Sequence, residues 1–291
     1  NYDEKWFWGL VMRRDAKACE ELGIDPVTYA AYHKSHISKV MSVTVTGIAF
    51  EDSLENGGGA VKIGNYRAQT NKIAQKVVYE NTRDGDGNLI PKLDDDGQKV
   101  IKRNRGDAYL VDCAVTGSTH GTPDAPKFPL KTVFEEKIFP DVAELVGPGG
   151  QYEGYIPINQ GDNAGPHEEE AFMKFVTEYC KERGWHWEPQ APQMPHMNNL
   201  DLSVFPCMSR RHTELARDRG GLHVLKEDEI WQAVEQVWKE LPNSKIASGY
   251  IQAYRIAQKV IASGGDNKFL GASNCGGMHV GVRNDFEATL L

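Results

Sequence analysis

The sequence predicts a mixed α/β domain in which short strands alternate with helices. Residues 36–50 are rich in Val, Ile and Thr, a composition typical of a strand. Residues 168–183 have acids in the first turn and Lys or Arg in the last, the arrangement that the helix dipole favours. Along the chain, strands are followed by a helix, a strand, a helix, a strand and further helices, an order typical of mixed α/β folds.

The other elements follow from similar local patterns. Strand-favouring residues predict a first strand at 2–12, and a polar, Ala-rich stretch predicts helix and loop at 14–35. A glycine-rich turn leads into a short extended piece at 55–64. Further along, we expect a strand at about 107–116, a helix at 128–146, short strands at 155–160 and 185–188, a proline-rich connection at 189–195, helix over 227–262 and an irregular, glycine-rich tail.

Residues 77–117 differ in character from the rest of the chain. Two extended runs flank an acidic centre that contains D-G turn signals, which predicts a hairpin or loop insertion. The segment 84–95 has a superficial likeness to a calcium-binding loop, with Asp84, Asp86 and Asn88 at ligand positions. Its sixth position is Leu89 rather than Gly, and Pro91 interrupts it, so a solvated hairpin tip is the favoured interpretation.

The composition excludes several classes of protein. With 40% hydrophobic and 25% charged residues, the 291-residue chain has an ordinary globular composition and no apolar run near the roughly 20 residues of a membrane helix. Its five scattered cysteines include no CxxC pair, which favours a reducing intracellular compartment over a disulfide framework or a zinc site. The net charge of −8 counts against a simple nucleic-acid coat protein, but it does not exclude a nuclease.

Three acidic residues lie where elements begin or end. Asp3 lies inside the first predicted strand, where a carboxylate is unfavourable unless something cationic neutralises it. Asp162 directly follows the strand at 155–160, and Asp201 lies at the apolar start of a helix. The chain between Asp162 and Asp201 is long enough for one helix and one strand, so the fold can bring these two acids together.

Three carboxylates at one sheet edge would suit Mg²⁺ or Mn²⁺, because hard divalent cations take oxygen ligands and retain several waters. Two such ions about 3.5–4 Å apart can activate the attacking oxygen and stabilise the leaving oxygen in phosphoryl transfer. Each acid alone is more often a turn or capping residue, so this hypothesis depends on all three together.

The residues around these acids resemble the three acidic motifs of the mariner-type DDE transposases. The matching segments are DEKWF around Asp3, QGDNAGPH around Asp162 and NNLDLSVF around Asp201. The resemblance extends to KVMSV in the second strand, RGDAYLVDCAVTG before the central helix and GGDN in the tail, in the expected order. It therefore touches most of the chain.

The resemblance implies a particular α/β fold, a ribonuclease H-like mixed sheet flanked by helices, with a hairpin or loop insertion and a helical C-terminal region. Residues 1–226 would form the catalytic core, with the insertion at about 77–106, and residues 227–291 would be a helical extension of the same domain. In this family DNA-binding helix-turn-helix modules precede the first acid. The chain is therefore expected to be a catalytic domain without that N-terminal region.

The resemblance also implies an enzyme that cuts double-stranded DNA at transposon ends and transfers the freed 3′ ends to a target. Such an enzyme would work in the nucleus, as a homodimer. Asp3, Asp162 and Asp201 would bind two Mg²⁺ ions, for which Mn²⁺ could substitute, and Asp3 would be the ligand that bridges both. The protein would supply positioning and charge neutralisation rather than a covalent nucleophile.

Supporting residues are expected beside the triad. Asn163 and His167 belong to the second motif and would support the site or touch DNA, although a strand-to-helix cap is an equally good interpretation. Asn198 would orient the third acid or, as the favoured alternative, cap its helix. Basic residues expected to contact DNA phosphates are Arg210 and Arg211 after the third acid, and Lys102, Arg103 and Arg105 in the insertion.

Three alternatives remain open on the sequence. The first is a decayed or host-recruited copy that binds DNA or a protein partner without cutting. The second is a generic structure-specific nuclease, which would cleave without joining. The third is a calcium-responsive module built on residues 84–95, whose calcium binding would depend on Asp84 and Asp86 rather than on the triad.

Overall fold

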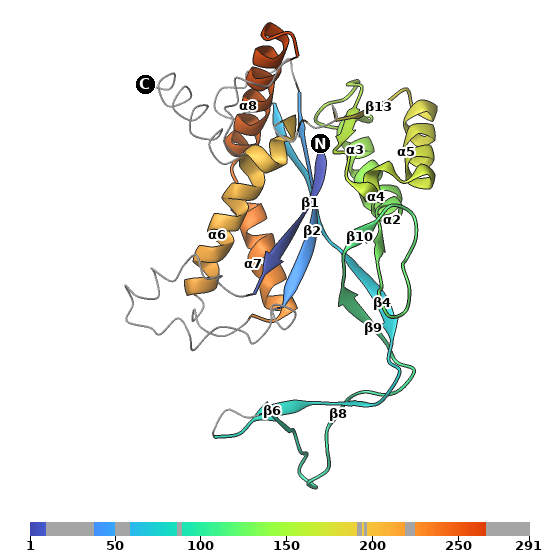
Figure 1. The fold of residues 1–291 in the computed structure, drawn as a ribbon, viewed down its shortest axis with the longest axis vertical. Helices are drawn as coiled ribbons and strands as arrows, with labels where there is room; N and C mark the ends of the chain where they lie inside the picture. The colour runs from blue at the N-terminus through green and yellow to red at the C-terminus, as the bar shows by residue number, and fades with distance from the viewer. Residues whose placement is uncertain are drawn as a thin grey trace.

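A computed structural model describes residues 1–9, 38–49, 59–85, 89–190, 194, 197–218 and 225–265. The predicted α/β class is confirmed for these parts of the chain, in which strands and helices alternate (Figure 1). The helix and loop expected at 14–35, and the tail after residue 265, lie outside the described residues. None of the described helices is long and apolar enough to span a membrane.

The centre of the molecule is a three-stranded antiparallel sheet with the order β1-β2-β3. Its strands are β1 (Tyr2–Trp8), β2 (Lys39–Ile48) and β3 (Ala60–Arg67). The middle strand β2 is buried over most of its length, which explains its Val-rich composition. In the register of the sheet, Asp3 is paired with Thr44, so the first acid lies beside the buried middle strand.

A second, parallel strand pair follows later in the chain. It consists of β12 (Ile158–Gly161) and β13 (His186–Pro189), which are connected through the short helix α4 (Gly165–Glu168) and helix α5 (Glu170–Glu182). Strand β12 lies beside β1. Gly161 permits this approach, because a Cβ at its position would be 2.5 Å from the ring of Tyr2.

Helices cover both faces of the central sheet (Figure 1). One group contains α2 (Leu130–Val133), the π-helical turn η4 (Phe134–Ile138), α3 (Phe139–Val146) and α5. The other contains the π-helical turn η6 (Leu200–Val204), α6 (Phe205–Asp218), α7 (Glu227–Glu240) and α8 (Asn243–Ala262).

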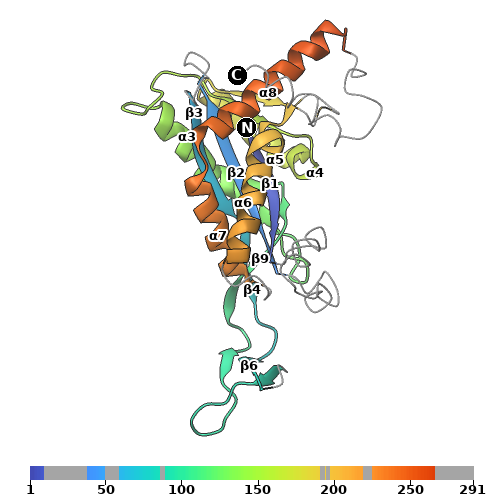
Figure 2. The ribbon, with the colours of Figure 1, turned by 90° about the vertical axis from the view of Figure 1, so that its left-hand side faces the viewer.

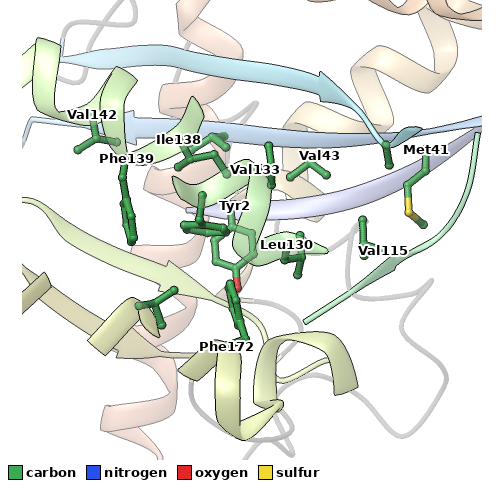
Figure 3. Close-up of a cluster of buried hydrophobic side chains, with 14 of the residues drawn as sticks. Tyr2, Met41, Val43, Val115, Leu130, Val133, Ile138, Phe139, Val142 and Phe172 are labelled. Carbon is green, nitrogen blue, oxygen red and sulfur yellow. The ribbon is translucent and has the colours of Figure 1, made fainter. Parts of the chain in front are cut away.

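Each helical group shares a separate hydrophobic cluster with the sheet. In the first cluster the ring of Phe134 is edge-on to Tyr2, with centroids 4.6 Å apart, and to Phe172, with centroids 5.3 Å apart. Tyr2 and Phe172 are labelled among the side chains of this cluster in Figure 3. In the second cluster Leu200, Val204 and Phe205 pack against α7 and α8. The start of the helix that carries Asp201 is therefore held between the sheet and two long helices.

The predicted insertion is an arm of paired antiparallel strands that projects from the body (Figures 1 and 2). Its three strand pairs, from the base outward, are β4 (Gln69–Ile73) with β9 (Ala108–Asp112), β5 (Val78–Tyr79) with β8 (Ile101–Arg103), and β6 (Asn81–Arg83) with β7 (Leu89–Pro91). The arm thus begins at Gln69, earlier than the sequence predicts, because β4 continues almost directly from the end of β3.

Several predicted boundaries are wrong in detail. The expected strand at 107–116 is divided into β9 and a short strand β10 (Val115–Thr116), which pairs with β11 (Phe128–Pro129). The expected helix over 227–262 is broken into α7 and α8 at Pro242, which has no N–H to continue the first helix. The expected strand at 155–160 begins only at Ile158.

Candidate functional site

The three predicted acids come from three separate elements and lie within electrostatic reach of one another. Asp3 is a buried residue of β1, Asp162 follows the end of β12 at half burial, and the exposed Asp201 lies in the first turn of η6. Burial, together with the negative charges of Glu4, Asp201 and Asp162, raises the pKa of Asp3 from 3.8 to about 8. The fold therefore concentrates negative charge at this sheet edge.

Asp3 is held by two short hydrogen bonds. The backbone N–H of Glu4 donates to Asp3 Oδ1 and Asn198 Nδ2 donates to Asp3 Oδ2, each at 2.6 Å. The carbonyl oxygen of the buried Asn198 side chain also accepts a hydrogen bond from the N–H of Leu200, at 3.1 Å. Asn198 thus caps the turn that carries Asp201, as expected, but it orients the first acid rather than the third.

Asp162 is held by a buried histidine. His167, on α4, lies in a salt bridge with Asp162 Oδ1 through Nδ1, and its Nε2 lies 3.0 Å from both carboxylate oxygens of Glu4. The N–H of Ala164 also donates to Asp162 Oδ1, at 2.9 Å. One oxygen of Asp162 is therefore fixed from two directions, and no hydrogen bond to its Oδ2 is found within the described residues.

The charges of this Glu4–His167–Asp162 chain support one another. Burial opposes a positive charge on His167, but the hydrogen bonds and charges of Asp162 and Glu4 raise its pKa to about 10. The ring is then doubly protonated at neutral pH and donates from both nitrogens. Partial burial tends to raise the pKa of Asp162, yet the hydrogen bond and charge of His167 lower it overall, so Asp162 is ionised.

Asp201 has a different environment. Partial removal from water raises the pKa of Asp201. The positive charge of Lys5 opposes this rise, and the negative charge of Asp162 adds to it. Lys5 also lies 5.7 Å from the ring centroid of Phe205. The carboxyl group of Asp201 is therefore influenced both by the other acids and by the positive charge of Lys5 on β1.

Asn163 does not point into this cluster. Its Nδ2 donates to the carbonyl oxygen of Gln190, at 2.8 Å, and so ties the end of β12 to the end of β13. A pocket of about 260 Å³ opens beside it and is lined by Asp162, His167 and Trp187, among others. Of the two supporting residues predicted from the second motif, His167 contacts Asp162 directly, whereas Asn163 connects the ends of the two neighbouring strands.

The two predicted basic clusters lie in different surroundings. Arg210 and Arg211 lie on α6, where Arg211 forms ion pairs with Glu214 at 3.1 Å and with Glu240 at 3.5 Å. Arg210 lies 4.0 Å from Glu214. The second cluster is distant from the acids: Lys102, Arg103 and Arg105 lie on the projecting arm.

Sequence reasoning missed Glu4 and Lys5, the two residues that follow Asp3. Glu4 has a side chain only 8% exposed and holds His167 in place, whereas Lys5 acts on Asp201. The signal was present in the sequence, since three charged residues in succession interrupt an otherwise apolar strand. A strand of this kind places neighbouring side chains on opposite faces, so such a run indicates charges on both sides of it.

The donor set fits a hard divalent cation in its chemistry. It consists of carboxyl oxygens, which such cations prefer. Burial and, after it, the neighbouring carboxylates raise the pKa of Asp3, so a cation bound there would favour its ionised form. Within the described residues, no three His, Cys, Asp or Glu side chains already stand at metal-binding distances. Binding would therefore require the carboxylates to turn toward the ion, and Asp3 would exchange a hydrogen bond for a metal bond.

Comparisons with known proteins add no relative. No family model matches the chain, and no curated protein matches it significantly.

Proposed function

We propose that the chain is the catalytic domain of a mariner-type transposase, which cleaves double-stranded DNA at transposon ends and transfers the 3′ ends to a target with Mg²⁺. The observation that carries this proposal is that the carboxyl groups of Asp3, Asp162 and Asp201 lie close enough for their charges to act on one another. These acids were selected from sequence motifs far apart in the chain, and each comes from a different element of the fold.

The arrangement of strands supports a ribonuclease H-like fold. An antiparallel β3-β2-β1 sheet is followed by the parallel strands β12 and β13, with β12 beside β1 and helices on both faces. Asp3 on β1 and Asp162 after β12 are consequently neighbours. A dimeric state and a nuclear location are further parts of this proposal, and they rest on the resemblance alone.

In this mechanism Asp3, Asp162 and Asp201 would hold the divalent ions. Bound ions would neutralise the phosphate and activate the attacking water or 3′ hydroxyl. His167 and the N–H of Ala164 hold Oδ1 of Asp162, so Oδ2 would be the oxygen available to a cation. Asn198 and the N–H of Glu4 hold the two oxygens of Asp3, and one of these hydrogen bonds would be exchanged for the cation.

Calorimetric titration with Mn²⁺ tests this proposal directly. The unaltered chain should bind Mn²⁺, Asp162→Ala should lose most of that binding, and Asp124→Ala, which removes an exposed acid elsewhere, should not. Equal binding by the chain and Asp162→Ala would contradict the metal site. A positive result justifies a DNA cleavage and joining assay, in which joining separates a transposase from a simple nuclease.

One observation favours a second candidate, a transposase-derived protein that no longer cuts. Both oxygens of Asp3 already accept hydrogen bonds from the protein, so its carboxyl group has partners without a cation. Absence of Mn²⁺ binding by the unaltered chain, together with retained DNA affinity, would select this alternative.

A further inference from the structure

The projecting arm has a strong segregation of charge along its length. The arm stem, which we define as residues 72–79 and 99–105, contains six Lys or Arg residues and no acid. The arm tip, residues 80–85 and 89–98, contains five acids and two basic residues. This stem stands out in a chain whose net charge is −8. One end of the arm is therefore basic and the other acidic.

Few of these charges are neutralised within the chain. Within the described part of the arm, Lys92 forms an ion pair with Glu80, at 2.9 Å. Lys99 and Arg103 lie over the rings of Tyr79 and Tyr109, at 5.6 and 3.8 Å from the ring centroids. For Lys76, Lys102 and Arg105, all exposed, no ion pair is found within the parts described. The basic stem thus remains open to a partner, unlike Arg211 on α6.

The arm also exposes an unusual amount of apolar surface. Leu110 is 60% exposed, Leu93 55%, and Ile101 50%. A ribbon of two strands has no second layer in which to bury such residues, and a lone hairpin is marginally stable in water. Most of the large apolar side chains exposed in the described part of the molecule belong to the arm, namely Ile73, Val77, Tyr79, Ile90, Leu93, Ile101 and Leu110.

Apolar surface and charge segregation together identify the kind of partner. DNA would use the basic stem but would repel the acidic tip and leave the apolar residues without a function. A second copy of the arm, running antiparallel, places each acidic tip on the other basic stem. A two-fold axis makes both contacts at once, since the same patch serves on both chains.

We propose that the arm is a self-association surface, through which two copies of the chain pair stem to tip. Exposed apolar residues such as Leu93 and Ile101 would fill the centre of this contact, and opposite charges would set its antiparallel orientation. This inference is independent of the metal site and of catalysis. It assigns the pairing of two chains to a segment that the acidic motifs do not include.

Charge reversal tests the proposal with two complementary variants. The stem variant reverses four exposed basic residues, which makes the stem net negative: Lys76→Glu, Lys99→Glu, Lys102→Glu and Arg105→Glu. The tip variant carries Asp95→Lys and Asp96→Lys, both at exposed positions, which makes the tip net positive. Light scattering after gel filtration should give about twice the 32.4 kDa of one chain for the unaltered protein. For each variant alone, the dimer dissociation constant should rise by about tenfold or more, because like charges then face each other.

Mixing the two variants provides the decisive result. The stem variant has two acidic ends and the tip variant two basic ends, so a one-to-one mixture should restore a dimer that neither forms alone. A matched control, Lys174→Glu with Lys181→Glu on α5, should dimerise as the unaltered chain does. Unchanged thermal unfolding of all variants, measured at a concentration low enough to keep every chain monomeric, would show that the arm changes do not act through misfolding.

Several results would overturn this proposal. A chain that is monomeric at every concentration, or variants that dimerise normally, would show that no second arm occupies the surface. Weaker binding of a duplex DNA oligonucleotide by the stem variant, with an unchanged oligomeric state, would assign the stem to DNA instead. Mn²⁺ binding should be the same in the stem variant, so failure here is distinguishable from failure of the metal site.

Discussion

The body and the arm of this protein treat charged residues in opposite ways. In the body, Asp3 and His167 are buried, and each has a hydrogen bond to a side chain from another part of the fold. In the arm, charged and apolar side chains alike lie at the surface with few partners in the chain. Burial makes charges in the body sensitive to one another, whereas exposure makes those of the arm available to other molecules.

This contrast separates stability from recognition. A side chain removed from the body leaves a cavity or an unpaired charge, and both are strongly destabilising. A side chain removed from the arm leaves only water beside its neighbours, so its loss is detectable mainly in association. The predictions below test this separation, beginning with the largest expected effect.

The aromatic cluster beneath the acidic site should be the most sensitive part of the fold. Phe134 is 1% exposed and has edge-on contacts with Tyr2, Phe139 and Phe172. Phe134→Ala should lower the free energy of unfolding by about 3–5 kcal/mol, because the cavity between α5 and the sheet cannot close fully. Urea unfolding followed by tryptophan fluorescence measures this value. A loss below about 1 kcal/mol would contradict the packing described here.

The buried chain Glu4–His167–Asp162 should be nearly as important. His167→Ala removes the only cation between two carboxylates, so we expect a loss of about 3 kcal/mol in unfolding free energy at pH 7. Glu4→Gln is the gentler comparison, since an amide oxygen can still accept a hydrogen bond from His167 and one buried charge is removed. If the two variants were equally stable, His167 would not be held as an ion pair.

The pH dependence of this pair has a definite sign. The pKa of His167 is raised from 6.5 to about 10, so its contribution to stability is full below pH 6.5 and is lost as the pH rises through about 10. Chemical unfolding of the unaltered chain between pH 6 and pH 10.5 should record this decline. The decline should be weaker in Glu4→Gln, in which His167 has one anionic partner fewer.

The acidic triad provides the strongest lesson on what a sequence can predict. Each acid was recognisable because apolar strand or helix residues surround it, and these patterns placed Asp3, Asp162 and Asp201 on the correct elements. The pairing of Glu4 with His167 was not predictable, because it depends on β12 lying beside β1. The same holds for Arg211, whose partner Glu240 comes from the end of another helix.

The arm illustrates the same limit from the other side. Its D-G turn signals predicted a hairpin, which the strand pairing confirms. The sequence also contained its segregated charges, but their arrangement in space depends on the strand register, which places Arg103 opposite Val78 and Lys99 opposite Leu93. A local pattern can therefore predict a turn, whereas a surface requires the paired strands.

Mn²⁺ binding should depend on pH in the direction set by Asp3. Its pKa is raised from 3.8 to about 8, so the folded chain loses stability as the pH rises from about 4 to about 8. A bound cation would favour the ionised acid and release its proton, so the apparent Kd for Mn²⁺ should tighten by up to about tenfold per pH unit over this range. Melting temperatures with and without Mn²⁺ at pH 6 and pH 8 measure this effect. A Mn²⁺-induced rise that is the same at both pH values would show that Asp3 is not a ligand.

The smallest effect is expected on the arm. Leu110 is 60% exposed and lies opposite Asn71 in the pairing of β4 with β9, so Leu110→Ser removes little buried area from a single chain. We expect the free energy of unfolding to change by no more than about 0.5 kcal/mol, measured at a protein concentration low enough to keep the chain monomeric. At high concentration the same variant should unfold more readily than the unaltered chain, because the proposed dimer, which loss of Leu110 would weaken, stabilises the unaltered chain more as its concentration rises. A large loss at low concentration would instead mean that the arm belongs to the folded core of one chain, and the contrast between body and arm would fail.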